Sequence, residues 1–225
     1  MPYSVDFNFD QAATAGAKNL NDTSQGNLRI GGAGELIVSQ MWGKYGELCK
    51  RGCVFSARSV LQAIPIQTTL TNSPCLWNPS TSGKIVIPLS IAVSPGTVGT
   101  PVIHGLTLSF LINTGATVAA GLPIATWTEI AETCCYVGSA KVASAQFAAG
   151  TVTFTANPAL LMDLGMMHWL EGAAASGTHA CYSKDLDGMV LMRPGTLISV
   201  GATAATSTLY ATTIVWAEVA DFGSL

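Results

Sequence analysis

The residues of this sequence best suited to chemistry are six cysteines and three histidines. Two of the cysteines form a C-x3-C pair and two are adjacent, but no second Cys or His pair follows at the spacing of a zinc site. Adjacent cysteines rarely bond to each other, because the intervening peptide would be strained. With no export signal visible at the N-terminus, the sequence predicts no metal site and reduced thiols that pack as small hydrophobic side chains. These nine residues are Cys49, Cys53, Cys75, Cys134, Cys135, Cys181, His104, His168 and His179.

A nucleophile with its base would have to be assembled from four separate residues: His104, His168, Cys181 and Asp185. None of them stands in a G-x-S-x-G, H-E-x-x-H or dinucleotide-binding pattern. Residues 78–84 resemble a phosphate-binding loop, but Asn78 replaces the required glycine and Ile85 replaces the required Ser or Thr. We therefore interpret this segment as a hairpin turn between strands, and predict no catalytic or cofactor-binding residue.

Three carboxylates offer an alternative, because glycoside hydrolysis needs a pair of them. Glu129 and Glu132 lie near a predicted strand end, and Glu218 lies in the last predicted strand beside Trp216. The favoured interpretation is structural, with Glu218 facing solvent or a subunit contact and Trp216 packing in the core. The five tryptophans are dispersed, which favours core and interface packing over a sugar-stacking platform. They are Trp42, Trp77, Trp127, Trp169 and Trp216.

The composition indicates a packed protein with little ionic surface. Of 225 residues, 10% are charged and 49% are hydrophobic, and the net charge is −3; ordinary soluble domains carry about 25% charged residues. Intrinsic disorder and a phosphate-tracking nucleic-acid surface are therefore excluded. Residues 85–128 carry no charge, but proline and glycine interrupt them every few residues, which excludes a transmembrane helix. We expect instead that other subunits cover much of the surface.

The pattern along the chain predicts a mainly β protein: an antiparallel β-sandwich, jelly-roll-like, with an extended N-terminal arm and one short helix. Residues 1–33 are polar and rich in Asn, Gly and Ala, and form the arm. Residues 34–225 form a single domain, which starts with a helix at about 34–51 because Ile37, Met41 and Tyr45 repeat at helical spacing. Residues 158–172 are interpreted as an inserted helix or a loop. Short β-branched runs predict strands at 54–61, 64–68, 84–93, 105–113, 124–130, 134–137, 151–155, 189–192, 196–200 and 208–219.

Several of these segments resemble structural proteins of tailed-bacteriophage virions. The resemblance lies in residues 45–55, residues 76–84, and the C-terminal pair 186–196 and 214–219. It implies a non-enzymatic virion component with a jelly-roll-like body, a capsid decoration or cement protein or a head-spike or fibre-base component. It further implies a homo-oligomer, a trimer, that contacts the major capsid protein or other virion proteins and is assembled in the host cytoplasm. It carries over no catalytic, cofactor-binding or metal-binding residue, and neither nucleic acid nor membrane is expected as a partner.

Two other classes of protein stay open. A carbohydrate- or receptor-binding module would place its aromatic side chains together on one exposed loop end. A secreted or outer-membrane β protein would have an upstream signal in a longer precursor.

Overall fold

The computed structural model describes residues 43–66, 73–97, 104–112, 128–149, 152, 154, 158–167, 181–204 and 209–221. The chain divides into two compact units, Met1–Lys44 and Tyr45–Leu225, and the fold below is that of the second unit. The predicted arm, residues 1–33, lies outside the described residues, as does the predicted helical segment up to residue 42.

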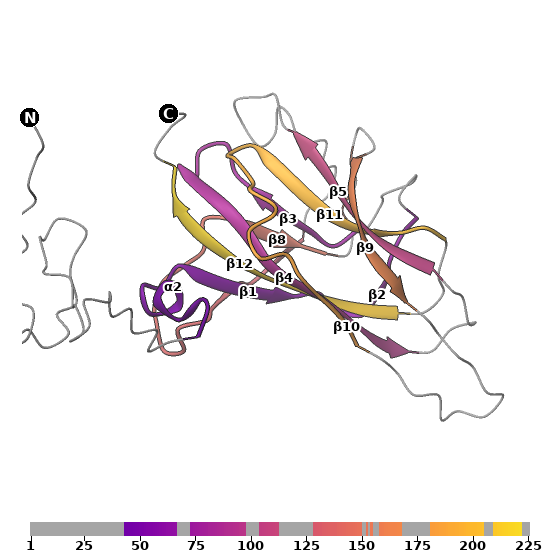
Figure 1. The fold of residues 1–225 in the computed structure, drawn as a ribbon, viewed down its shortest axis with the longest axis horizontal. Coiled ribbons are helices and arrows are strands. Elements are labelled where there is room, and N and C mark those ends of the chain that lie inside the picture. The colour runs from indigo at the N-terminus through magenta and orange to yellow at the C-terminus, as the bar shows by residue number, and fades with distance from the viewer. Residues whose placement is uncertain are drawn as a thin grey trace, which may run out of the picture. The chain divides into compact units, whose positions relative to one another are not determined.

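In its described residues the second unit is mainly β, as predicted, and these residues include one short helix (Figure 1). Most predicted strand regions contain a strand, although the bounds differ by a few residues. The elements are α2 (Gly46–Lys50), β1 (Val54–Arg58), β2 (Gln62–Ala63), β3 (Cys75–Asn78), β4 (Lys84–Thr97), β5 (His104–Ile112), β6 (Glu129–Ile130), β7 (Thr133–Cys134), β8 (Gln146–Ala148), β9 (Ala159–Met167), β10 (Tyr182–Asp185), β11 (Thr196–Ala202) and β12 (Leu209–Ala220).

The strands form two antiparallel sheets, and their order is that of a jelly roll. The first sheet runs β10-β4-β12-β1-β7, with β2 also paired to β12, and the second runs β6-β8-β3-β11-β5-β9. Eight of the described strands have four or more residues. They are β1, β3, β4, β5, β9, β10, β11 and β12. If these eight are numbered 1 to 8 along the chain, their order is 6-3-8-1 in one sheet and 2-7-4-5 in the other, which is the order of two interlocked Greek keys. The predicted antiparallel, jelly-roll-like sandwich is confirmed.

The core lies between the two sheets and is filled by alternate residues of each strand. The longest pairing joins β12 to β4, and it places Tyr210, Ile214 and Trp216 in the core. The Trp216 ring lies 6.2 Å from that of Phe55, centroid to centroid. Because side chains alternate along a strand, the same pattern sends Ala217 to the outer face. The predicted packing of Trp216 in the core is confirmed.

Helix α2 packs on that outer face, but it is shorter than the predicted 34–51. Residues 43–45 form a turn, and the helix begins after Tyr45. Gly43 and Gly46 flank this turn, and glycine inside a helix costs roughly 1 kcal/mol relative to alanine. Leu48 and Cys49 pack against a cluster of outer-face residues, Val54, Leu89 and Ala217.

Three other predictions are wrong in detail. Residues 158–172 were expected to form a helix or a loop, but β9 occupies 159–167 as an edge strand. Residues 189–192 form a loop whose only ladder contact is the bridge between Met192 and Val86. The turn at 78–84 is not a hairpin, because β3 and β4 belong to different sheets. The buried Asn78 side chain holds this corner by donating hydrogen bonds to the Lys84 and Met192 carbonyls, at 2.8 and 2.9 Å.

A segment between β5 and β9 closes one side of the sandwich. We call residues 128–149 the strap; it contains β6, β7 and β8. Although β5 and β9 lie at the opposite edge, the strap adds β7 to the edge strand β1 and adds β8 to β3. It thereby covers the edges of both sheets on this side.

The opposite side, between β9 and β10, is closed by one tyrosine. The Tyr182 hydroxyl of β10 donates a hydrogen bond to the Leu164 carbonyl of β9, in the other sheet. Gly165, next to Leu164, has a φ of 148°, in the region that favours glycine. A Cβ at this position would lie 2.5 Å from the Tyr182 hydroxyl oxygen. The close approach of the two strands therefore requires glycine.

We expect Gly165→Ala to lower the free energy of unfolding by about 2 kcal/mol or more, because it adds both backbone strain and a clash. Gly138→Ala is the matched control. Gly138 also has a positive φ, 87°, but no atom lies within 4 Å of its added Cβ, so only the strain of roughly 1 kcal/mol applies. Urea denaturation of both variants measures the difference. Equal losses would show that Tyr182 does not pack on Gly165.

Candidate functional site

The four residues considered for nucleophilic catalysis are not brought together in the part of the chain that the structure describes. His168 lies outside the described residues, and only the backbone of His104 is described, in β5. Cys181 and Asp185 stand at opposite ends of β10, and both are exposed. The Cys181 sulfur lies 3.1 Å from the Ser94 hydroxyl. No nucleophile–base pair follows from these positions.

Glu218 is buried, so the prediction that it faces solvent or a subunit contact is wrong. Its side chain is 5% exposed and points between the sheets from β12. The carboxylate accepts hydrogen bonds from the backbone N–H groups of Ser144 and Ala145, at 2.8–2.9 Å, and from the Trp216 indole at 3.2 Å. Four short contacts occupy both oxygens. The physical role of Glu218 is therefore to hold the strap against the sandwich.

A second carboxylate holds the strap from within. The Glu132 carboxylate accepts a hydrogen bond from the backbone N–H of Phe147 at 2.9 Å. Burial raises the pKa of Glu132 above its usual value; the Phe147 N–H opposes this rise, and the negative charges of Glu129 and Glu218 add to it. The three carboxylates considered for glycoside hydrolysis are thus near one another. Two of them accept backbone hydrogen bonds within the fold, and Glu129 is exposed.

All six cysteines are free thiols. Cys75 and Cys134 are buried, as predicted for small hydrophobic side chains, whereas Cys181 is exposed. Burial raises the pKa of Cys75. Burial also raises the pKa values of Cys49 and Cys135, and neighbouring thiols add to the rise. Protonated thiols are weak nucleophiles, so Cys49, Cys75 and Cys135 are poorly suited to nucleophilic chemistry.

The described tryptophans, Trp77 and Trp216, are also buried, as the dispersed pattern predicted. Trp42, Trp127 and Trp169 lie outside the described residues.

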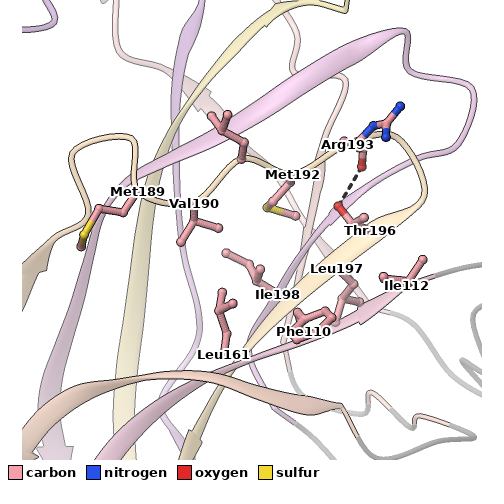
Figure 2. A pocket seen from close by; sticks show the side chains of 11 residues that line it. Phe110, Ile112, Leu161, Met189, Val190, Met192, Arg193, Thr196, Leu197 and Ile198 are labelled. Carbon is pink, nitrogen blue, oxygen red and sulfur yellow. Dashed lines mark hydrogen bonds between the residues drawn. The ribbon is translucent and has the colours of Figure 1, made fainter. Parts of the chain in front are cut away.

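An apolar groove opens on the surface of the described residues (Figure 2). It has a volume of about 330 Å³ and is bordered by β5, the start of β9, the 189–193 loop and the start of β11. Figure 2 shows the loop facing Phe110 and Ile198 across the groove. Its floor is formed by core side chains, Val190 and Met192 among them.

The rim of the groove is exposed and almost entirely apolar. Met189 and Leu191 are each 63% exposed, Ile112 is 58% exposed and Leu161 is 42% exposed. Arg193 is the one charged residue that lines the groove, and it is exposed. This arrangement has no acid–base chemistry of its own; it suits the binding of an apolar group with a nearby negative charge.

Sequence reasoning did not find this groove. Three of its exposed rim residues, Leu161, Met189 and Leu191, fall in 158–172 and 189–192, two segments whose structure was predicted wrongly. The available signal is the closely spaced Met189, Leu191 and Met192 after the Asp187–Gly188 turn, a run that the sequence pattern predicts as a strand.

Comparisons with known proteins do not assign a family. No family model matches the chain, and no curated protein matches it. In the part of the chain that the structure describes, no helix has both the length and the hydropathy needed to cross a membrane. The same residues contain no group of three or more His, Cys, Asp or Glu side chains placed to bind a metal ion.

We expect Glu218→Ala to lower the free energy of unfolding by about 3 kcal/mol or more, because it leaves buried N–H groups of Ser144, Ala145 and Trp216 without an acceptor. The control is Glu129→Ala, an exposed carboxylate in the same region, which should change stability by less than about 0.5 kcal/mol. Chemical denaturation followed by tryptophan fluorescence measures both. A loss for Glu218→Ala no larger than the control would contradict the anchoring role.

The raised pKa of Glu132 predicts a pH dependence of stability. Because the folded state holds this proton more tightly than the unfolded chain, the contribution of Glu132 to stability is complete below about pH 4.5. This contribution to stability is lost as the pH rises through the raised pKa of Glu132 in the folded state. Glu132→Gln keeps an oxygen for the Phe147 N–H but cannot ionise. We therefore expect the melting temperature of the variant, relative to that of the wild type, to increase between pH 4 and pH 7. A relative decrease over this range would refute the raised pKa of Glu132.

Proposed function

We propose that this protein is a non-enzymatic structural subunit of a tailed-bacteriophage virion, a capsid decoration or cement protein or a head-spike or fibre-base component, which acts through subunit contacts. The observation that carries the proposal is an exposed apolar groove on a jelly-roll body with few charges. Jelly rolls recur in viral capsid domains and also in lectins and cupins. The fold alone therefore supports the proposal only by analogy.

The apolar surface supports assembly more directly. The groove rim exposes large apolar side chains, Met189 and Leu191 among them, and contiguous patches of this kind mark interaction sites in soluble proteins. The strap exposes a second apolar site, where Val137 is 92% exposed and Val142 is 83% exposed. With 10% of all residues charged, the chain has few charged side chains to surround these patches. Coverage by other subunits accounts for the exposed apolar side chains and for the low share of charged residues.

A carbohydrate- or receptor-binding module is the alternative function. It requires exposed aromatic side chains grouped at one end of the sandwich. Trp77 and Trp216 are buried, and Tyr136 is the one large aromatic residue that is prominently exposed in the described part of the chain. These positions give the alternative no specific support.

We expect the isolated chain to form a homo-oligomer, a trimer, at micromolar concentration, and particles of the phage that encodes it to contain the chain. Light scattering coupled to gel filtration measures the first, and mass spectrometry of purified particles measures the second. A stable monomer that is absent from the particles would refute the proposal.

The variant Leu191→Asp tests whether the groove rim takes part in these contacts. Because Leu191 is exposed, the melting temperature should hardly change, but the oligomer should dissociate at concentrations at which the wild type is intact. Val142→Asp is the companion variant and tests the second apolar site, in the strap at the opposite side of the sandwich. If only Val142→Asp dissociates the oligomer, the contact lies at the strap and not at the groove.

A further inference from the structure

The groove exists because one side of the sandwich is only half closed. Strand β10 has four residues, and Tyr182 at its start closes the gap to β9. After Asp185 the chain follows β4 without forming a strand, held by hydrogen bonds from the Leu186 N–H to the Leu89 carbonyl and between Met192 and Val86. The next described hydrogen bond between this segment and the second sheet comes at its end, where Asn78 of β3 donates to the Met192 carbonyl, and the groove opens along the segment before it. Core residues such as Phe110 and Ile198 therefore line an open groove.

The strand beside the groove offers a free backbone edge. Strand β9 is the last strand of its sheet, and among the described strands it pairs only with β5. Its first residues, Leu160 and Leu161, are exposed, and Leu161 lines the groove. An unpaired edge next to an apolar groove accepts an extended peptide, because the backbone forms ladder hydrogen bonds while alternate side chains enter the groove.

The sequence of the chain contains a segment with the matching pattern. Apolar residues occupy every second position at Tyr3, Val5, Phe7 and Phe9, and the intervening residues are Ser, Asp and Asn. In an extended conformation the four apolar side chains fall on one face. Seven residues would span roughly 20 Å. The segment is thus amphipathic as a strand.

The charges of the segment and of the groove are also complementary. Asp6 lies within the alternating segment and Asp10 follows it. Arg193 is the charged residue at the groove, and it forms no ion pair with any described residue. A peptide with its apolar face in the groove keeps Asp6 on the solvent side, and the long Arg193 side chain is exposed at the rim, where its guanidinium can reach that carboxylate.

We propose that residues 3–9 of one copy of the chain bind as an extended strand along β9 of a second copy, with their apolar side chains in the groove. The inference rests on the proposed function, because it names the partner through which the subunits associate. A second copy is the occupant that the composition favours, since the charge-poor chain needs other subunits to cover its apolar surface. The body also begins beside the groove: the Tyr45 hydroxyl donates a hydrogen bond to Asp187, two residues before Met189, at 2.7 Å. Arms and grooves can therefore be exchanged reciprocally in a closed ring.

Disulfide trapping between two full-length chains tests the inference. One chain carries Phe7→Cys and the other, with a different affinity tag, carries Leu191→Cys; both carry Cys181→Ser to remove the exposed thiol. After mixing and oxidation with oxidised glutathione, we expect a covalent species of twice the chain mass that contains both tags and disappears on reduction. Asn8→Cys in place of Phe7→Cys is the matched control. Asn8 lies on the polar face of the segment, so the yield should fall several-fold.

A charge exchange supplies an independent readout. Arg193→Glu should weaken the oligomer measured by light scattering, and Asp6→Lys with Asp10→Lys in the same chain should restore it. The melting temperatures of all variants, followed by circular dichroism, show that each is folded. Loss without restoration would count against a contact between the segment and Arg193.

The outcomes separate this inference from the proposed function. An intact oligomer without a mixed-tag species overturns the strand exchange but leaves assembly standing. A single chain carrying both Phe7→Cys and Leu191→Cys that forms only an internal disulfide, with none in the mixture, shows that the segment binds its own body and also overturns the inference. A wild-type monomer refutes the proposed assembly itself.

Discussion

The closure of the two open sides of the sandwich is the constraint on which the rest of the structure depends. Two twisted sheets leave the sides of their common core open to water unless a strand, loop or side chain covers them. On one side the strap supplies extra strands to β1 and β3 and is held by the buried carboxylate of Glu218. On the other side Tyr182 reaches across to the backbone beside Gly165. Beyond Asp185 the apolar groove opens between the described strands on this side.

The chemistry of the carboxylates follows from this closure. A catalytic carboxylate must be free to exchange a proton with substrate or water. The Glu218 oxygens instead accept hydrogen bonds from two backbone N–H groups of the strap and from the Trp216 indole, so the charge is used to satisfy buried donors. The same residue type and spacing that suggested hydrolysis in the sequence therefore serves to fasten a long connection. Each of these buried donors would cost about 1–3 kcal/mol without an acceptor, and the Glu218 carboxylate accepts from all three.

Much of the fold could be predicted from sequence, but its edges could not. Strands such as β12 and β11 consist of β-branched and apolar residues with few turn formers, so their local preference and their final structure agree. Strand β9 carries a leucine- and methionine-rich stretch whose local preference is ambiguous, and pairing with β5 decides its structure. The burial of Glu218 depends on N–H groups 73 and 74 residues away. No local pattern encodes such a contact. The groove was missed for the same reason, because it lies between segments that only the fold brings together.

The scarcity of charge also limits how such a protein can recognise a partner. Long-range steering requires many charges of one sign on a surface, and this chain has ten basic and thirteen acidic residues in all. Specificity must then come from shape, from backbone hydrogen bonds at a free strand edge, and from single ion pairs placed beside apolar contacts. The groove combines these three elements within one site: the β9 edge, the apolar rim of Met189 and Leu191, and one guanidinium at Arg193. Contacts of this kind depend weakly on salt and are slow to separate once apolar surface is buried, which are the properties that a permanent assembly requires.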